Sequence, residues 1–400
     1  MTEPQIEQLF LVPGRTKAET AIWGAAVMEF TVRFPGVFIS HDYAEAVRPH
    51  YDRLTIVEPD YWPEELWTMI KQNPRRMRVE KLSAPSPEVL AEILHVRVYY
   101  GLRFGFQTGF DWAQQWTPSV SLIGLHGRAD GEMLQPDLDI VRTARMEAVK
   151  LTSHATASTL EALRAINRGL LIMVRPIEAF AEGNRPRRVT AAEFVERTSP
   201  DLQRLFDYDS SIQHVEVHNE PNLVIEGQGG SWNNGGEFGS WFNDVVALYR
   251  KQWPYKKYGF PGLSPGDSIG GVRSGMKQFL AEAALAATRA DWIGVHGYWQ
   301  TERGMTADDD GFTWRYYRQL FPDKLMFITE FGNPTQPKTQ VAQQYAQYYG
   351  ILRHVGGLGG AFSYIVSTSD PVESPRWAWR DEAGNDVGIA HEIGLRRFIR

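Results

Sequence analysis

A strand-like run that ends in a polar turn, HVEVHNEPN, occupies residues 214–222. A helix-compatible stretch follows at Ser240–Trp253, in which Trp241, Val245 and Leu248 recur at helical spacing, so that one face can be buried. A short apolar strand followed by an amphipathic helix is the repeating unit of a parallel α/β sheet. This stretch therefore predicts an α/β fold, and its neighbours decide which one.

The same unit repeats on both sides of this stretch. Eight strand-like runs are expected, at Val120–Leu125, Ala148–Thr152, Leu170–Val174, His214–His218, Tyr258–Leu263, Trp292–His296, Leu325–Thr329 and Ala361–Val366. Helices are expected between them, at Asp137–Glu147, Ser158–Asn167, Ala191–Phe206, Ser240–Trp253, Val272–Arg289, Thr313–Leu320 and Gln340–His354. Eight such units within residues 119–400 predict a closed (β/α)8 TIM barrel rather than an open sheet.

Residues 1–110 follow a different pattern, which predicts a small N-terminal α/β unit of unknown role. The expected strands are Val37–Ser40, Arg53–Glu58, Met77–Leu82 and Arg97–Gly101, and the expected helices are Tyr43–His50, Pro63–Lys71 and Pro87–Leu94. The stretch Leu102–Pro118 is rich in Gly, Phe and Trp, and is a candidate junction between the two parts.

The composition excludes some classes of function. A formal net charge of −6 argues against a nucleic-acid partner, which would require a basic face. The chain has no cysteine, so disulfides and thiolate chemistry are excluded. No apolar stretch approaches the ~18 residues of a membrane span, and no signal peptide is visible. Localisation is left open between the cytoplasm and export with the signal removed, and the oligomeric state is undetermined.

Two glutamates follow strands that lie nearly opposite each other in the predicted barrel. Glu220 closes the fourth strand and Glu330 closes the seventh. The carboxyl ends of barrel strands meet at one mouth, so the two carboxylates are expected to converge there. Hydrolysis of an acetal requires such a pair, because one group protonates the leaving oxygen while the other attacks the anomeric carbon or activates water. The alternative is that both are buried rim residues paired with arginine.

The motifs around these glutamates resemble those of the clan A glycoside hydrolases. The resemblance rests on Asn219-Glu220-Pro221 after strand four and Thr329-Glu330-Phe331-Gly332 after strand seven. It implies a retaining mechanism, with Glu220 as acid/base, Glu330 as nucleophile and Asn219 hydrogen-bonded to the sugar 2-hydroxyl. It also implies that no cofactor or metal is required.

A third motif is similar to family 5 of this clan. His296-Gly297-Tyr298 ends strand six, and the resemblance implies that Tyr298 donates a hydrogen bond to Glu330 while His296 lines the subsite. Glu216, four residues before Glu220, fits a pattern of the same family and faces the barrel interior by strand alternation.

The sequence departs from family 5 at two strand ends. Strand two ends Lys150–Ser153 where that family usually has an arginine, and Arg175 at the end of strand three is a candidate substitute and subsite residue. Strand eight ends Tyr364–Ser367 where many members of the clan place a tryptophan, and Trp377 and Trp379 come later. The clan resemblance therefore leaves the family open.

Other candidates near the mouth carry less specific signals. Trp299 follows the His-x-Tyr motif and is expected in the cleft, and His126 after strand one is a candidate subsite residue. As a metal ligand, His126 lacks a His-x-His partner. Trp232 lies in a glycine-rich loop that either presents it to glycan or is simply flexible, and Asp308–Asp310 is expected to be a solvated loop rather than a calcium site.

Together these features predict a retaining hydrolase that cleaves β-glycosidic bonds in an oligo- or polysaccharide. Two alternatives stay open: a transglycosylase that uses the same residues, and a catalytically inactive glycan-binding barrel. The sequence does not name the sugar or the linkage, and does not decide between endo and exo cleavage.

Overall fold

The computed structural model of the chain describes residues 7–48, 51, 53–73, 78–99, 116, 120–183 and 185–396. Internal contacts divide the chain into two compact units. The first comprises Met1–Thr108, Gly350–Gly356 and Arg396–Arg400, and the second comprises Gly109–Tyr349 and Gly357–Leu395. In the part of the chain that the structure describes, no helix has the length and hydropathy needed to cross a bilayer.

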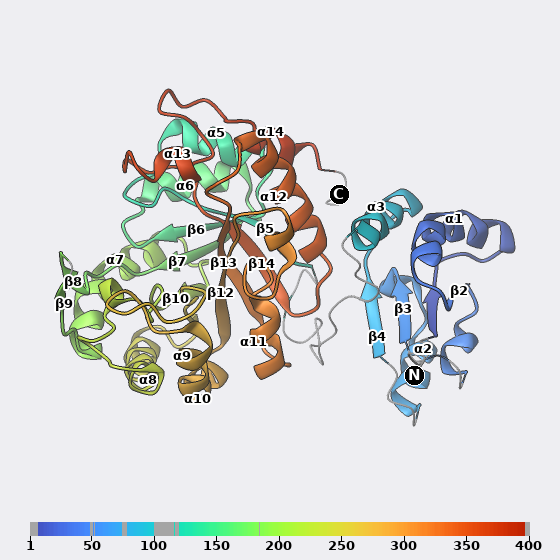
Figure 1. The fold of residues 1–400 in the computed structure, drawn as a ribbon, viewed down its shortest axis with the longest axis horizontal. Coiled ribbons are helices and arrows are strands. Elements are labelled where there is room, and N and C mark those ends of the chain that lie inside the picture. The colour runs from blue at the N-terminus through green and yellow to red at the C-terminus, as the bar shows by residue number, and fades with distance from the viewer. Residues whose placement is uncertain are drawn as a thin grey trace. The chain divides into compact units, whose positions relative to one another are not determined.

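The first unit is built on a parallel four-stranded sheet in the order β2-β1-β3-β4 (Figure 1). Its elements are β1 (Gln8–Leu11), α1 (Lys17–Arg33), β2 (Val37–Ser40), η1 (Tyr43–Val47), β3 (Arg53–Val57), η2 (Pro59–Tyr61), α2 (Glu64–Gln72), β4 (Arg78–Leu82) and α3 (Pro87–Tyr99). The strand predicted at Arg97–Gly101 is wrong for residues 97–99, which are the last turn of α3, and its other two residues lie outside the described part of the chain.

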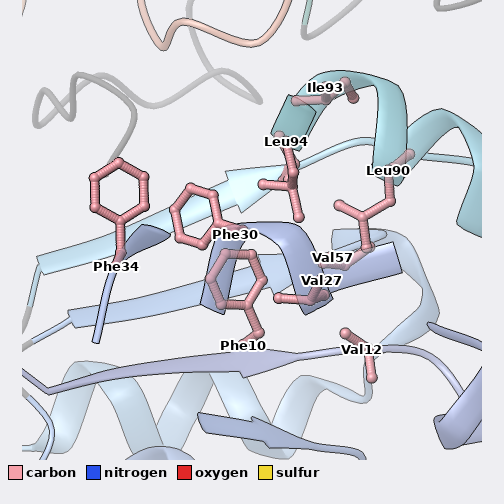
Figure 2. Packing of buried hydrophobic residues seen from close by; sticks show 11 residues of the cluster. Phe10, Val12, Val27, Phe30, Phe34, Val57, Leu90, Ile93 and Leu94 are labelled. Carbon is pink, nitrogen blue, oxygen red and sulfur yellow. The ribbon is translucent and has the colours of Figure 1, made fainter. Parts of the chain in front are cut away.

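Side chains of β1 alternate between two hydrophobic cores, as the twofold period of a strand requires. Phe10 packs with residues of α1 and α3, including Phe30 and Leu94, in the core drawn in Figure 2. Leu9 and Leu11 belong to the second core, which contains residues of η1, β3 and α2. The sheet is therefore covered by α1 and α3 on one face and by η1 and α2 on the other.

A buried polar network explains why α3 extends past its predicted end. The Arg97 guanidinium on α3 donates to both oxygens of Glu80 on β4, at 3.1 and 2.6 Å. Thr55 on β3 donates to the same carboxylate, and Gln8 on β1 donates to Thr55. Arg97 can reach and neutralise the buried Glu80 carboxylate because helix α3 continues as far as residue 97.

The second unit is a closed barrel of eight parallel strands, which confirms the predicted (β/α)8 fold (Figure 1). The strands run around the barrel in the order β10-β11-β12-β13-β14-β5-β6-β7. Their bounds are β5 (Leu122–His126), β6 (Ala148–Thr152), β7 (Leu171–Arg175), β10 (His214–Glu216), β11 (Lys257–Phe260), β12 (Trp292–Tyr298), β13 (Met326–Gly332) and β14 (Leu358–Ser363).

Helices follow the strands as predicted, and short elements decorate the loops. The helices are α5 (Gln135–Thr143), α6 (Ala157–Ile166), α7 (Ala191–Tyr208), α8 (Gly235–Gln252), α9 (Met276–Glu282), α10 (Ala284–Arg289), α11 (Trp314–Leu320), α12 (Lys338–Leu352), α13 (Ser374–Trp377) and α14 (Ile389–Gly394). The helix predicted at Val272–Arg289 is two helices that meet at Ala283. The loop elements are the hairpin β8 (Ala181–Glu182) and β9 (Arg185–Pro186), and the turns η3 (Val224–Glu226) and η4 (Arg303–Thr306).

The barrel interior changes character along its axis. An apolar cluster fills it near the amino ends of the strands, and includes Trp116, Trp292 and Phe327. Charged side chains lie further along the same strands, among them Lys150 on β6 and Glu330 on β13, and both are buried. This apolar cluster excludes water from the amino end of the barrel, so polar chemistry is confined to the carboxyl ends of the strands.

A register shift in β13 brings Glu330 into the interior. Phe327 points into the barrel, and strict alternation would then turn residue 330 outward. However, Ile328 pairs with Val295 and Glu330 pairs with His296, so Thr329 is an extra residue in this register. Such a bulge re-aims the side chains that follow it, and here it places the carboxylate inside.

Candidate active site

A cavity of about 530 Å³ opens at the carboxyl ends of the barrel strands. Several loops contribute to its wall. The lining residues are Arg175, Asn219, Glu220, Ser264, Pro265, Gly266, Arg273, Tyr298, Gln300, Asp309, Asp310, Glu330, Tyr364, Glu373 and Trp377. The structure thus brings five of the predicted site residues to one cavity, namely Glu220, Glu330, Asn219, Tyr298 and Arg175.

Glu330 is held by donors at both carboxylate oxygens. Nζ of Lys150 and Nη1 of Arg175 donate to Oε1, at 2.9 and 2.8 Å. The hydroxyl of Tyr298 donates to Oε2 at 2.7 Å, which is the contact that the family 5 motif implies. Three donors on two oxygens fix the orientation of the carboxylate in the cavity.

Two opposing effects act on the pKa of Glu330. Burial alone would raise it, but the charges of Lys150, His296 and Arg175 outweigh burial and hold the pKa well below its usual range. Glu330 is therefore ionised at neutral pH. Burial, and after it the negative charge of Glu330, raise the pKa of the Tyr298 hydroxyl, which remains a donor.

Glu220 adopts a backbone conformation that is unusual for a glutamate. Its φ angle is +35°, in the left-handed region that costs a residue with a Cβ of order 1–3 kcal/mol. Its N–H donates to the carbonyl of Gly262 at 3.0 Å, and its side chain lines the cavity. Strain of this kind persists where surrounding structure enforces it, and such positions cluster at active sites.

His296 connects the two glutamates. Its Nδ1 lies 2.8 Å from Oε1 of Glu220 and 3.8 Å from Oε2 of Glu330. Burial would lower the pKa of the imidazole, but the two carboxylates raise it above the usual value. Gly262 makes room for this ring, because a Cβ at that position would lie 2.2 Å from Cδ2 of His296. The imidazole therefore lies between the two carboxyl groups and contacts both with the same nitrogen.

Lys150 is a site residue that we did not predict from the sequence. Its Nζ bridges Glu330 and Oε2 of Glu216, which lies 3.0 Å away, and the two side chains are fully buried. Burial opposes ionisation of Glu216, but Lys150 and Arg175 lower its pKa. The available signal was a lysine in the middle of AVKLT (148–152), a strand in which every residue is buried.

Asn219 is held at both ends of its amide. Nη1 of Arg175 donates to Oδ1, and Nδ2 donates to Oε1 of Glu226 at 2.9 Å. Arg175, proposed from the sequence only as a substitute arginine, thus contacts both Asn219 and Glu330. Glu226 on η3 was not predicted, and nothing in the glycine-rich loop around it distinguishes it from a surface acid.

His126 lies beside Glu330 rather than on the cavity wall. The ring is buried, Nδ1 donates to the carbonyl of Gly127, and Nε2 is 3.8 Å from Oε1 of Glu330. Burial, Lys150 and Arg175 lower its pKa, so the ring is neutral. Among the described residues, no group of three or more His, Asp or Glu side chains is arranged to hold a metal ion.

The structure corrects the expectation for two tryptophans. Trp299 is 1% exposed, stacks on Phe331 and donates to Gln344, so it cannot offer a face to a sugar in the cleft. Trp232 is also 1% exposed and donates to the carbonyl of Pro221. It packs among aromatic residues, including Phe180. Both rings are part of the core under the loops.

The aromatic wall of the cavity comes from other residues. Trp377 on α13 packs edge-on against Tyr298 and Tyr364, with ring centroids 5.3 and 5.6 Å apart. Tyr364 donates to Glu373 at 3.2 Å. Trp377 therefore reaches the cavity from a loop after strand eight, although it lies outside the strand end where the clan usually has a tryptophan.

Two of the three aspartates at 308–310 make surface ion pairs. Asp308 pairs with Arg315, and Asp309 pairs with Lys277, in both cases with an exposed aspartate. Asp309 and Asp310 also line the outer part of the cavity.

No protein-family model matches this sequence, and no curated protein matches it. Solved structures that are similar include a GH30 endoxylanase from Clostridium papyrosolvens C71, with 12% identity over 69% of this chain and 71% of that chain and a TM-score of 0.47. A glucosidase from Croceicoccus marinus is 14% identical over 73% of this chain and 68% of that chain, with a TM-score of 0.48. An endo-1,4-β-D-mannanase from Thermotoga petrophila RKU-1 is 12% identical over 68% of this chain and 98% of that chain, with a TM-score of 0.40. These low identities and TM-scores leave the reaction to be argued from the residues of the site itself.

Proposed function

We propose that the protein is a retaining glycoside hydrolase of the clan A type, with Glu330 as nucleophile and Glu220 as acid/base. The observation that carries this proposal is the contrast between the two carboxyl groups. Glu330 is bound by the cationic side chains of Lys150 and Arg175, which keep it ionised, whereas the one salt-bridge partner of the Glu220 carboxyl group in the described part of the chain is His296. Two carboxyl groups in such different environments suit one nucleophile and one proton donor.

The geometry favours retention of configuration. In retaining enzymes the two carboxyl groups lie about 5–5.5 Å apart, and in inverting enzymes about 6.5–9.5 Å, which leaves room for a water. Nδ1 of His296 lies 2.8 Å from an oxygen of Glu220 and 3.8 Å from an oxygen of Glu330. These two distances set an upper limit on the separation of the two oxygens, and that limit lies at the lower end of the inverting range.

In the first step, the Glu330 carboxylate attacks the anomeric carbon as the bond to the leaving oxygen breaks. Glu220 gives its proton to that oxygen, and a covalent glycosyl ester forms on Glu330. In the second step, Glu220 takes a proton from water, the water oxygen attacks the anomeric carbon, and Glu330 leaves as a carboxylate. Lys150 and Arg175 stabilise Glu330 as an anion before and after the ester.

Asn219, Tyr298 and Trp377 are placed to orient the sugar. The Asn219 amide lines the cavity next to Glu220, where it can reach a sugar hydroxyl. Tyr298 holds the nucleophile, and the Trp377 ring offers an apolar face beside the polar groups of the cavity. This combination suits a neutral carbohydrate, which presents hydroxyl groups on its edge and C–H groups on its faces.

The proposal is tested by reducing-sugar release from a panel of β-glucans, mannans and xylans. We expect the wild-type protein to release sugar from at least one of them, and Glu330→Gln to lose at least about 10³-fold in kcat. Glu182→Gln changes an exposed glutamate on the β8–β9 hairpin and is the matched control, which should keep wild-type activity.

The configuration of the first product, read by proton NMR, tests the mechanism separately. Retention supports the double displacement, and inversion would exclude it. If added sugars become acceptors and longer products form, the chain is a transglycosylase with the same residues. Binding of oligosaccharides without turnover by the wild-type protein would instead establish the inactive glycan-binding barrel.

A further inference from the structure

A third carboxylic acid lies directly behind the cavity wall and takes no part in the proposed reaction. Glu226 ends the turn η3 in the loop after β10, and its Oε1 accepts a hydrogen bond from Nδ2 of Asn219 at 2.9 Å. The opposite end of that amide, Oδ1, accepts from Arg175. The two contacts are complementary, since one group accepts and the other donates, and together they fix which end of the amide faces the cavity.

The position of Glu226 is set by the structure around it. The buried ring of His218 lies with Nε2 2.8 Å from the Glu226 carbonyl, and burial lowers the pKa of this histidine to about 4, so the neutral ring donates from Nε2. The next residue, Gly227, has a φ angle of +114° and abuts Trp232, whose ring would lie 2.8 Å from an added Cβ. The backbone of Glu226 is therefore held at a fixed place behind Asn219.

The charges around Glu226 explain its protonation behaviour. Burial is the largest effect and raises the pKa, Asn219 and Arg175 lower it, and Glu220 and Glu330 raise it, with a result of about 7. The hairpin β8–β9 packs against η3 and contributes the exposed side chains of Glu182 and Arg185. Among the described residues, no lysine or arginine forms a salt bridge with Glu226.

Lysine and arginine side chains form ion pairs with two of the carboxyl groups at the site, those of Glu216 and Glu330, but not with those of Glu220 and Glu226 among the described residues. Lys150 bridges Glu216 and Glu330, and Arg175 pairs with Glu330. Two permanent cations thus balance two carboxylates. In the part of the chain that the structure describes, neither Glu220 nor Glu226 forms a salt bridge with a lysine or arginine, and of these two only Glu220 lines the cavity.

We propose that Glu226 is a positioning residue for Asn219, which it holds in the binding orientation when ionised and releases when protonated. Ionised Glu226 is a strong acceptor for Nδ2, whereas a protonated carboxyl is a weaker one and can itself donate. Substrate positioning by Asn219 then depends on pH independently of the acid/base group. That Asn219 meets a sugar hydroxyl rests on the proposed function, whereas the link between Glu226 and Asn219 does not.

The link is tested without any substrate. The full chain is labelled with ¹⁵N at asparagine, and the side-chain amide signals of Asn219 are assigned with Asn219→Ser and followed between about pH 5 and 9. We expect both signals to titrate with a midpoint near 7 in the wild type and to lose that titration in Glu226→Gln.

Two variants separate Glu226 from its neighbours. The titration should persist in Glu220→Gln, which removes the acid/base group, and in Glu182→Gln, which removes an exposed acid near η3. Signals that do not move with pH in the wild type, or that lose their titration in Glu220→Gln and keep it in Glu226→Gln, would overturn the proposal. Neither result would bear on whether the protein is a hydrolase.

Kinetics with the substrate found in the panel test the consequence. Glu226→Leu removes the acceptor and should lower kcat/KM about tenfold, the effect of one hydrogen bond of about 1.4 kcal/mol. Glu226→Gln keeps a neutral acceptor, so it should restore most of that loss and remove the inflection near pH 7. A purely structural role predicts the same pH profile in all three proteins, and that result would contradict the proposal.

Discussion

Nζ of Lys150 lies 2.9 Å from Oε1 of Glu330, and both side chains are buried. The lysine is the first of the groups that lower the pKa of the nucleophile. Its role can be separated from that of Arg175. The Arg175 guanidinium also donates to Asn219, whereas the Lys150 ammonium donates to the carboxylates of Glu216 and Glu330.

Replacing Lys150 by methionine should raise the pKa of Glu330, because a positive charge is removed while burial is kept. The acid limb of the kcat/KM profile should therefore move to higher pH, and activity near that limb should fall. Lys150→Arg keeps the charge and is the matched control. An acid limb that stays in place in Lys150→Met would show that Lys150 does not act on the nucleophile.

The role of Glu220 can be tested with azide, a nucleophile that needs no base. Glu220→Ala should hydrolyse an aryl β-glycoside slowly, because the loss of general base catalysis costs about 10²–10⁴-fold in the second step. Added azide should restore the rate and give a glycosyl azide of retained configuration. Glu330→Ala serves as the comparison, since azide attacking in place of the lost nucleophile would give the inverted product.

The raised pKa of Glu226 predicts that stability falls as pH rises through a defined window. Between about pH 4.3, the usual value for a glutamate, and 7, the folded protein keeps a proton that the unfolded chain has lost. The free energy of unfolding should therefore decrease across this window, by up to about 4 kcal/mol and less where solvent reaches the carboxyl. Urea unfolding of the wild type and Glu226→Gln at several pH values measures it, and parallel curves would refute the assignment.

Below that window the dependence reverses. Glu216 and Glu330 have lowered pKa values, so their ion pairs stabilise the fold above about pH 4.3 and this contribution is lost as pH falls further. The Glu226→Gln variant should lose stability in acid as the wild type does, because these two glutamates are unchanged.

The two tryptophans next to the site should respond in opposite ways to truncation. Trp299→Ala removes a core ring and should lower the free energy of unfolding by about 3–5 kcal/mol. Trp377→Ala removes a ring that lines the cavity and should raise KM with a smaller effect on stability. Denaturant unfolding and initial rates distinguish them, and a KM effect without destabilisation in Trp299→Ala would show that its ring reaches substrate after all.

The barrel could be predicted from the sequence because its strand–helix unit is repeated eight times. Each strand is a short apolar run and each helix carries a buried face, so eight local patterns support one another. The N-terminal unit offered no such repetition, and β1 and α1 were missed. The exposed positions of α1 include Ile22, Met28 and Val32, so its apolar residues do not form a single stripe that would mark it as an amphipathic helix.

The site residues were predictable where a motif fixed them and not where packing did. Glu220, Glu330 and Tyr298 lie at or near the carboxyl ends of strands, which converge in any such barrel. Lys150 and Glu226 depend on which groups the fold brings beside them, and no local pattern encodes that. The prediction that Trp299 lies in the cleft was wrong because the side chain that follows a motif can point to either side of the loop. Here the indole ring points into the core, where it stacks on Phe331 and donates a hydrogen bond to Gln344.

The bulge at Thr329 adds one residue to the reactive strand without adding a position to its pairing. Phe327 and Glu330 both face the interior because this extra residue stands between their paired neighbours. Loss of the Thr329 codon would bring Glu330 to the second position after Phe327, where the regular alternation of a strand still turns the carboxylate inward. The inward direction of the nucleophile should therefore survive a single in-frame deletion at this position.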